Sequence, residues 1–235
     1  MSVRINKYLT EMGVCSRREA DRWIEQKRIK INGIPAIMGQ KISDADSVTV
    51  DGKPIRKKDD WVYLMYNKPI GVISTTDPSI PNNIVDAIKY PKRIFHIGRL
   101  DKDSEGLILM TNDGDIVNEI LRSEHEHEKE YVVKVNRPLT PEVVQKMIRG
   151  VPILGTVTKP CTLQLITPDT FKIVLTEGMN RQIRRMCQYF DYEVLSLKRV
   201  RIMHLHLDVP KGAYRSLTPK ELSELFRRIG RPPID

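Results

Sequence analysis

The chain has 235 residues, of which 40% are hydrophobic and 29% are charged, as expected for a globular protein with one large domain or two smaller ones. We expect neither a signal peptide nor a membrane span, since no apolar run approaches roughly 18 residues. The excess of 39 Lys and Arg over 30 Asp and Glu gives a net charge of +9, which favours a polyanionic partner, with nucleic acid before an anionic membrane surface. Three widely spaced cysteines indicate reduced thiols and a cytoplasmic protein.

The first 60 residues carry the pattern of a separate small unit. Apolar residues recur at helical spacing over residues 5–12. Ser16 and Glu19, three positions apart, form a capping-box signature for a second helix. Two short β segments follow, with Asn-Gly at 32–33 and Asp-Gly at 51–52 as tight-turn dipeptides. The pattern predicts two helices followed by a small hairpin sheet.

Basic side chains crowd the helical part of this unit. Arg18 and Arg22 are four residues apart and share a helix face, with Arg17 at its border. A solvated surface is the ordinary interpretation of such a face, but on that face no acid lies four residues from Arg18 or Arg22, which favours phosphate contact. The candidate phosphate-binding residues are Arg4, Lys7, Arg17, Arg18, Arg22, Arg28 and Lys30.

Residues 3–50 resemble an S4 RNA-binding domain, in which two helices and a small sheet present a basic face to structured RNA. The resemblance implies RNA binding through the residues just named, but no chemistry. We therefore expect an S4 domain over residues 1–60.

A charged stretch at residues 56–60 is the predicted linker, and a second domain is expected over residues 61–235. A helix is predicted between Thr140, followed by Pro141, and Gly150. Strands are predicted within 61–75 (broken by a turn at 69–71), 93–100, 106–114 (ending in an Asp-Gly turn) and 130–135. Because strands and helices alternate without a regular βαβ rhythm, we expect an α+β domain with a mixed, largely antiparallel sheet flanked by helices.

Three carboxylates crowd the segment GRLDKDSEGL, at Asp101, Asp103 and Glu105. A calcium loop fails, because Asn112 stands where the bidentate acid is needed and an apolar strand intervenes. A catalytic pair of Asp101 and Asp103 is unsupported, since both lie in a glycine-bounded turn. The remaining hypothesis is one working carboxylate, which would need a nearby cation to stay ionised in a pocket.

The segment EGMNRQIRRMCQYF offers such a cation. Asn180 is predicted to cap a helix whose apolar stripe includes Ile183. Arg184 falls on the flank of that stripe, and Arg185 points away from it. Spacing alone leaves open whether both arginines are simply surface residues.

Four segments, YNKPIGVIST, GRLDKDSEGL, HEKEY and GMNRQIRRM, resemble the pseudouridine synthases that carry an S4 domain. The segments GVPILGTVTK and NRQIRRMC are most similar to the branch that acts on large-subunit ribosomal RNA. The resemblance implies isomerisation of a flipped-out uridine to pseudouridine in 23S ribosomal RNA, with a transfer RNA as a second candidate substrate. It implies no cofactor and no metal.

The resemblance also assigns roles to individual residues. It makes Asp101 the catalytic nucleophile and Arg184 the basic residue paired with it. It makes Tyr131 the aromatic residue that stacks on the extruded uracil, Ile183 an apolar residue lining the pocket, and Arg99 a residue inserted into the RNA. Asp103 and Glu105 become turn residues, and the RNA-contact set gains Arg181 and Arg185. Attack on C1′ and proton removal to form a glycal both remain open for Asp101.

Two other functions remain open: a non-catalytic S4-type ribosome-assembly factor, and a glycoside hydrolase. A metal at His125 and His127 is disfavoured, since no third ligand is near in the sequence. Lys68 is expected to be structural. The basic surface is expected to include Lys198, Arg199 and Arg201. Nothing in the chain requires a dimer, so we expect a monomer.

Overall fold

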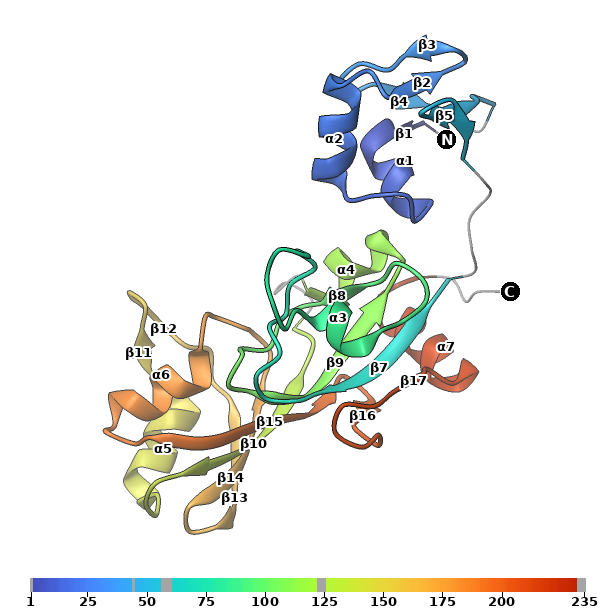
Figure 1. The fold of residues 1–235 in the computed structure, drawn as a ribbon. Coiled ribbons are helices and arrows are strands. Elements are labelled where there is room, and N and C mark those ends of the chain that lie inside the picture. The colour runs from blue at the N-terminus through green and yellow to red at the C-terminus, as the bar shows by residue number, and fades with distance from the viewer. Residues whose placement is uncertain (1, 44, 56–60, 122–125, 232–235) are drawn as a thin grey trace. The chain divides into compact units, whose positions relative to one another are not determined.

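The computed structural model describes residues 2–43, 45–55, 61–121 and 126–231 (Figure 1). The chain divides into two compact units. The first comprises Met1–Val62, Tyr90–Ile94 and Thr111–Gly114, and the second comprises the remaining residues from Tyr63 onward. The predicted linker at 56–60 lies outside the described residues. No helix in the described part of the chain has the length and apolar character needed to cross a membrane.

The first unit contains the two predicted helices, α1 (Ile5–Glu11) and α2 (Arg17–Glu25). The capping box is confirmed, because Ser16 Oγ accepts from the Glu19 amide and the Glu19 carboxylate accepts from the Ser16 amide. The core forms where the helices meet the sheet, and it includes Ile5, Leu9 and Ile29.

The two hairpins of this unit are also confirmed. The four-stranded antiparallel sheet has the order β3-β2-β5-β6. Asn32 and Gly33 have φ of 51° and 82°, and Asp51 and Gly52 have φ of 50° and 75°, the left-handed pair that an Asn-Gly or Asp-Gly hairpin turn requires. The strands are β1 (Val3–Arg4), β2 (Ile29–Ile31), β3 (Ile34–Pro35), β4 (Lys41–Ile42), β5 (Val48–Val50) and β6 (Lys53–Pro54), with β1 paired to β4.

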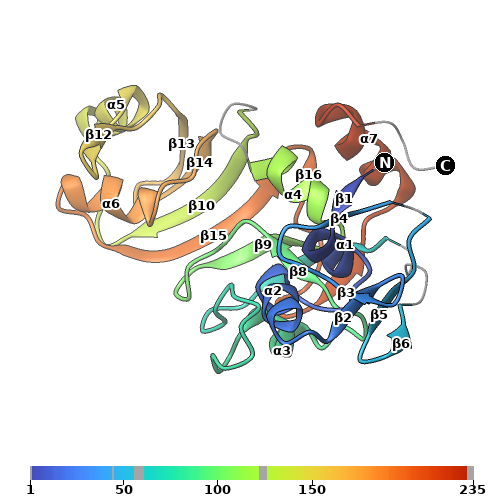
Figure 2. The ribbon, with the colours of Figure 1, turned by 90° about the horizontal axis from the view of Figure 1, so that it is seen from above.

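The second unit is built on a nine-stranded sheet with the order β13-β14-β10-β15-β9-β7-β17, to which β16 and β8 add at β15 and β9 (Figure 2). The sheet is mixed and largely antiparallel, as predicted. Its strands are β7 (Tyr63–Lys68), β8 (Phe95–Ile97), β9 (Glu105–Thr111), β10 (Lys129–Val135), β13 (Thr162–Thr167), β14 (Thr170–Leu175), β15 (Val194–Ile202), β16 (Leu205–His206) and β17 (Tyr214–Ser216). A separate hairpin joins β11 (Pro152–Ile153) to β12 (Thr156–Val157).

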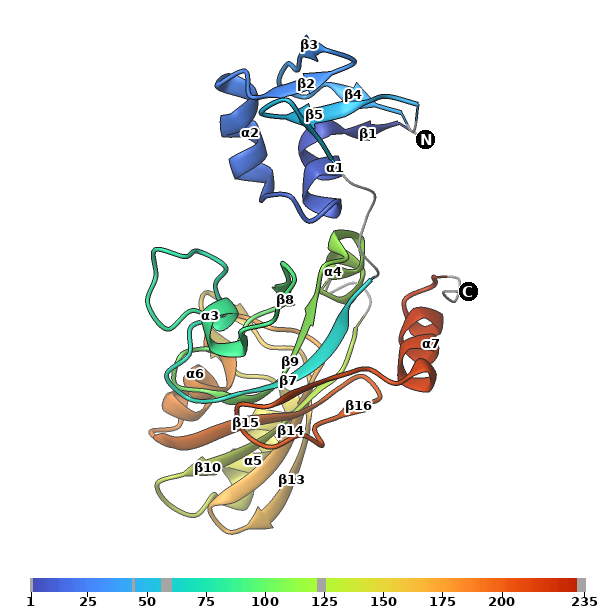
Figure 3. The same cartoon turned by 45° about the vertical axis from the view of Figure 1, so that its right-hand side comes forward.

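Five helices flank this sheet (Figure 3), within the described residues: α3 (Ile84–Ile88), α4 (Gly114–Leu121), α5 (Pro141–Arg149), α6 (Gln182–Tyr189) and α7 (Pro219–Arg228). Helix α5 is capped by Thr140 at its start and by Gly150 at its end, as predicted. Two predictions were wrong. The predicted Asp-Gly turn at the end of β9 is not formed, because Gly114 is the first residue of α4. Asn180 does not cap α6; the cap is Arg181 in a left-handed conformation, without a side-chain hydrogen bond.

Strand β15 joins the two halves of the sheet. It runs antiparallel to β10, where Arg199 lies opposite Tyr131, and parallel to β9, where Arg199 lies opposite Gly106. One strand position therefore touches both the segment carrying Tyr131 and the segment that follows Asp101. This pairing places the candidate site.

Candidate active site

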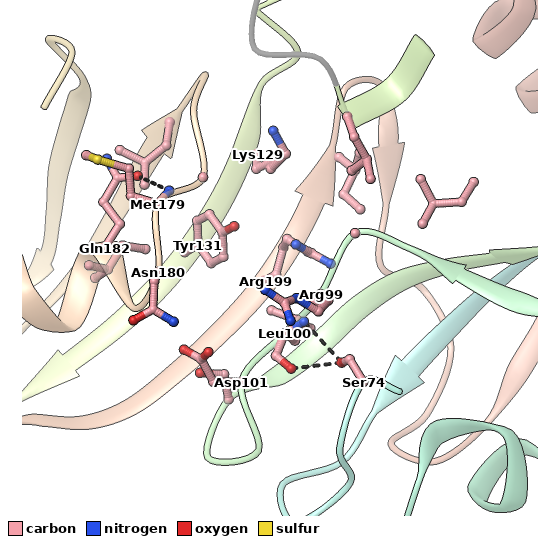
Figure 4. A pocket seen from close by; sticks show the side chains of 18 of the residues that line it. Ser74, Arg99, Leu100, Asp101, Lys129, Tyr131, Met179, Asn180, Gln182 and Arg199 are labelled. Atoms are coloured by element: carbon pink, nitrogen blue, oxygen red, sulfur yellow. Dashed lines mark hydrogen bonds between the residues drawn. The ribbon is translucent and has the colours of Figure 1, made fainter. Parts of the chain in front are cut away.

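A cavity of about 850 Å³ lies within the second unit, and segments distant in sequence line it (Figure 4). Asp101 and Arg99 come from the loop between β8 and β9, and Tyr131 comes from β10. Ile183, on α6, lines the same cavity and is buried. The structure thus brings together four of the five residues expected at the catalytic centre.

The loop that carries Asp101 is held by backbone hydrogen bonds. The Ser74 hydroxyl donates to the Leu100 carbonyl at 2.8 Å and accepts from the Leu100 amide at 3.1 Å. The Ser104 amide donates to the Asp101 carbonyl at 3.1 Å. Since both polar groups of Leu100 are satisfied by one buried hydroxyl, Ser74 fixes the backbone immediately before Asp101.

Arg184 does not pair with Asp101, contrary to the expectation from the resemblance. Its Nη2 donates to the Asp103 carbonyl at 2.8 Å, and its Nε lies 3.5 Å from the Asp103 carboxylate. Its Nη1 donates to the Val194 carbonyl at 3.1 Å. The Arg184 guanidinium therefore donates to two backbone carbonyls, and no ion pair joins it to Asp101 in the described structure.

Asp103 and Glu105 have supporting contacts. Arg181 donates two hydrogen bonds of 3.0 Å to the Asp103 carboxylate and, with Arg184, holds the pKa of Asp103 below its ordinary value. Glu105 forms an ion pair with Lys211. The crowding of three carboxylates is thus relieved by separate cations, which leaves Asp101 as the one of the three that lines the cavity.

Tyr131 and Arg99 differ sharply in exposure. Tyr131 is 9% exposed and forms part of the cavity wall. Arg99 lines the same cavity but is exposed to solvent. The aromatic ring is therefore part of the buried cavity wall, whereas the residue Arg99 is accessible to solvent.

Three cations in or beside the cavity were missed as site residues. Lys68 is fully buried at the end of β7, and its Nζ donates to the carbonyls of Pro69 at 3.0 Å and Val72 at 2.8 Å. Burial lowers its pKa to about 8, and the nearby charge of Asp101 opposes this shift. The only sequence signal was a lysine directly before a proline turn, which predicts a structural role.

Arg199 was expected on the basic surface, and this expectation was wrong. The residue is 4% exposed and lines the cavity. Its Nε donates to the Leu107 carbonyl at 2.7 Å, whereas its buried Nη2 has no hydrogen-bond partner among the described residues. Because side chains alternate along β15, this position faces the cavity. On the paired strand β9, Gly106 leaves room for the Arg199 backbone.

Lys129 is the third cation. It lines the cavity two residues before Tyr131 on β10, and its Nζ donates to the His127 carbonyl at 3.1 Å. Burial, and then the charge of Arg199, lower the pKa of Lys129 to about 8. A lysine at spacing i, i+2 from the aromatic residue could have been predicted to share its face of the strand.

The predicted RNA-contact residues fall into two groups. Lys7 forms an ion pair with Glu11, and Arg28 bonds Asp51 and lies over the Trp23 ring at 4.6 Å. In contrast, the side chains of Arg4, Arg17, Arg18, Arg22 and Lys30 are exposed, and none of them forms an ion pair in the described part of the chain. In the second unit, Arg181 is bound to Asp103, and Arg185 donates to Asn180.

No group of three or more His, Cys, Asp or Glu residues suitable for a metal is present among residues 2–43, 45–55, 61–121 and 126–231. His125, one of the two histidines considered as ligands, lies outside these ranges. The nearby ring of His127 contacts the Glu119 carbonyl.

Comparisons with known proteins agree with this geometry. Residues 62–189 match the RNA pseudouridylate synthase family, and residues 3–36 match the S4 domain. The chain is 53% identical over 231 residues to the dual-specificity RNA pseudouridine synthase RluF of Salmonella typhi, covering 97% of this chain and 80% of the relative. It is 35% identical to the ribosomal large subunit pseudouridine synthase B of Bacillus subtilis, covering 94% and 95%.

A solved structure shows the same fold. The crystal structure of a pseudouridylate synthase superimposes with a TM-score of 0.70 at 28% identity, covering 95% of this chain and 99% of the other. Asp101 and Tyr131 lie inside the segment matched by the family, whereas the cavity residues Leu197, Arg199 and Ile202 lie beyond it. The chain belongs to the RNA pseudouridylate synthase family and carries an S4 domain before its synthase domain.

Proposed function

We propose that this protein converts a uridine of 23S ribosomal RNA to pseudouridine, with Asp101 as the catalytic carboxylate and a transfer RNA as a second candidate substrate. The similarity to RluF and to a ribosomal large subunit synthase supports this substrate. The observation that carries the proposal is that Asp101 and the Tyr131 ring line one cavity.

The substrate base must leave its stack to reach this cavity. Unstacking costs a few kcal/mol, and stacking on the Tyr131 ring offsets about 1–3 kcal/mol of that cost. Ile183 adds an apolar wall to the cavity. The exposed Arg99 lies at the place where RNA would meet the cavity, and it would occupy the position that the base has left.

The reaction breaks the N1–C1′ bond and forms a C5–C1′ bond. The Asp101 carboxylate either adds to C1′ or removes a proton from C2′ to give a glycal, and in both routes the bond electrons leave with the base. The base then turns against Tyr131 and presents C5. As C5 joins C1′, the ester bond to Asp101 breaks, or, in the glycal route, Asp101 returns its proton to C2′. The proton on C5 is then lost and N1 is protonated, so the product is an isomer of the substrate and the carboxylate is regenerated.

The exposed arginines of the S4 domain would bind folded RNA by electrostatic attraction to its phosphates. Arg17, Arg18 and Arg22 lie on or next to α2 without carboxylate partners in the described structure, so their charge is available for phosphates. We propose that the protein works as a monomer in the cytoplasm.

The test uses ribosomal RNA from cells that contain the wild-type protein, no protein, or Asp101→Ala. Pseudouridine would be mapped by carbodiimide labelling and primer extension. The proposal expects one stop in 23S RNA that disappears in the null strain and with Asp101→Ala, and that persists with Asp103→Asn as the matched control. An unchanged map in ribosomal and transfer RNA would instead favour a non-catalytic RNA-binding protein.

A further inference from the structure

Arg199 is a buried cation without a counter-ion. It is 4% exposed, and its Nη2 has no partner in the described structure. No carboxylate of the described residues forms an ion pair with it, and its single hydrogen bond goes from Nε to the neutral Leu107 carbonyl. Because an unpaired buried charge destabilises a folded protein, its position in the cavity wall points to an anion that arrives with the substrate.

The surroundings of Arg199 make this part of the cavity positive. Lys129 lines the same cavity, and the positive charge of Arg199 disfavours the charged form of the Lys129 ammonium. Lys68 is buried, and the charge of Arg199 also contributes to lowering the pKa of Lys68. The carboxylate residues that line the cavity with Lys129 and Arg199 are Asp101 and Glu177. Figure 4 shows Lys129, Tyr131 and Arg199 on neighbouring strands, with Asp101 on the loop beyond them.

The proposed reaction generates an anion at this place. When the N1–C1′ bond breaks, its electron pair stays on the uracil, and the negative charge spreads over N1 and the two carbonyl oxygens. The carboxylate of Asp101 is consumed as an ester or is protonated in the glycal route. The detached base is therefore a free monoanion that must be held next to the Tyr131 ring until it has turned.

We propose that Arg199 and Lys129 form an anion site that binds the detached uracil, with the Arg199 guanidinium donating to a base carbonyl oxygen. The inference rests on the proposed function. The site is preorganised, because the Leu107 carbonyl fixes the guanidinium and the His127 carbonyl holds the ammonium. Fixed donors aimed at a developing charge in a water-poor cavity stabilise a transition state more than the ground state.

A phosphate of the RNA backbone is the other anion that these cations could bind. The depth of Arg199 argues against it, because the phosphate chain passes outside the cavity that the base enters. The exposed Arg99 is better placed for a phosphate. Arg199 also lies directly across from Tyr131 in the strand register, which places its backbone beside the expected ring of the base.

The experiment compares two substrates that differ in the stability of the base anion. Full-length wild type, Arg199→Met and Lys129→Met would act on RNA carrying uridine or 5-fluorouridine at the target. Fluorine withdraws electrons and stabilises the departing base without help from the protein. Single-turnover loss of the target nucleoside would be followed by digestion and chromatography, since fluorine blocks the normal loss of the C5 proton.

For uridine, removal of one preorganised donor lowers the rate on the order of 100-fold. We expect Arg199→Met to show this loss of rate on uridine. On 5-fluorouridine, the factor by which its rate falls below that of wild type should be at least ten times smaller. Lys129→Met should show the same trend with a smaller loss. The matched control is Lys134→Met, an exposed cation on the same strand as Lys129, whose rates on both substrates should equal those of wild type.

Equal losses on the two substrates by folded variants would overturn the inference, as would weaker RNA binding with a reduced salt dependence, which indicates a phosphate contact. Melting curves would show whether Arg199→Met folds; if it does not, Lys129→Met decides by the same comparison. Failure of the proposed function looks different, because wild type would then convert neither substrate.

Discussion

Gly106 lies directly against the backbone of Arg199 at the junction of β9 and β15. A Cβ built on Gly106 would stand 2.2 Å from the Arg199 carbonyl oxygen and 2.7 Å from its nitrogen, and Gly106 has a φ of +112°. Both the close approach and the backbone conformation exclude a side chain. The glycine that ends the segment of three carboxylates is therefore what allows the two strands to pair.

Replacement of Gly106 by alanine should weaken the sheet at this junction. We expect Gly106→Ala to lower the free energy of unfolding by on the order of 3 kcal/mol, because backbone atoms must move apart. Urea unfolding would measure the loss. Gly155→Ala is the control, since Gly155 also has a positive φ, of +76°, but its Cβ would meet nothing within 4 Å. Equal losses in both variants would show that conformation alone, rather than the strand contact, is responsible.

Ser74 should affect catalysis through the position of Asp101. Ser74→Ala leaves both polar groups of Leu100 without their buried partner, which costs about 2 kcal/mol of stability. We also expect a lower kcat with little change in KM, because the loop before Asp101 loosens while the RNA contacts stay. The exposed Ser79, replaced by alanine, should leave both quantities unchanged. An unaltered kcat in Ser74→Ala would disprove the positioning role.

Lys68 should make stability depend on alkaline pH. Its pKa is lowered from 10.5 to about 8 in the folded protein by burial. Between these values the unfolded chain holds a proton that the folded chain has released, so unfolding is disfavoured further as the pH rises. We therefore expect the stability of wild type to increase from pH 8 to pH 10.5 relative to Lys68→Met. The measurement is urea unfolding across that range. Parallel curves for the two proteins would contradict the lowered pKa.

The unpaired arginines of the S4 domain should carry more RNA affinity than the paired one. Loss of both Arg18 and Arg22 should weaken RNA binding and reduce the slope of log K against log salt by about 1.5, since two phosphate contacts disappear. Arg28→Ala should change the slope less, because Arg28 is bound to Asp51. Filter binding at several salt concentrations measures both. A larger effect from Arg28 would mean that its ion pair opens on RNA.

Features set by neighbouring residues were the ones predictable from sequence. The caps at Ser16 and Thr140 and the two hairpin turns depend on side chains within a few positions, and the structure confirms them. The same local reasoning failed after β9, where the glycine of an Asp-Gly dipeptide expected to form a turn instead begins α4. Such a dipeptide permits a tight turn without requiring one.

The polar partners in and around the cavity could not be predicted in this way. Arg184 contacts Asp103 rather than Asp101 because of where α6 packs against the loop that carries both aspartates. The two segments are far apart in the sequence, so this contact depends on the tertiary fold. The inward direction of Arg199 depends on the register of β15 against β9. Motif resemblance located the aspartate and the tyrosine, but the basic cluster of Lys198, Arg199 and Arg201 gave no sign that Arg199 is buried.

The pairing of β9 with β15 also determines when the protein becomes competent during its synthesis. The hydrogen bond from Arg199 to Leu107 joins residues 92 positions apart. Contacts at such separation form late, because a long loop must close before they contribute. A ribosome that has released only the aspartate loop and Tyr131 therefore carries a chain whose cavity lacks one wall. Catalytic competence awaits emergence of the last third of the polypeptide.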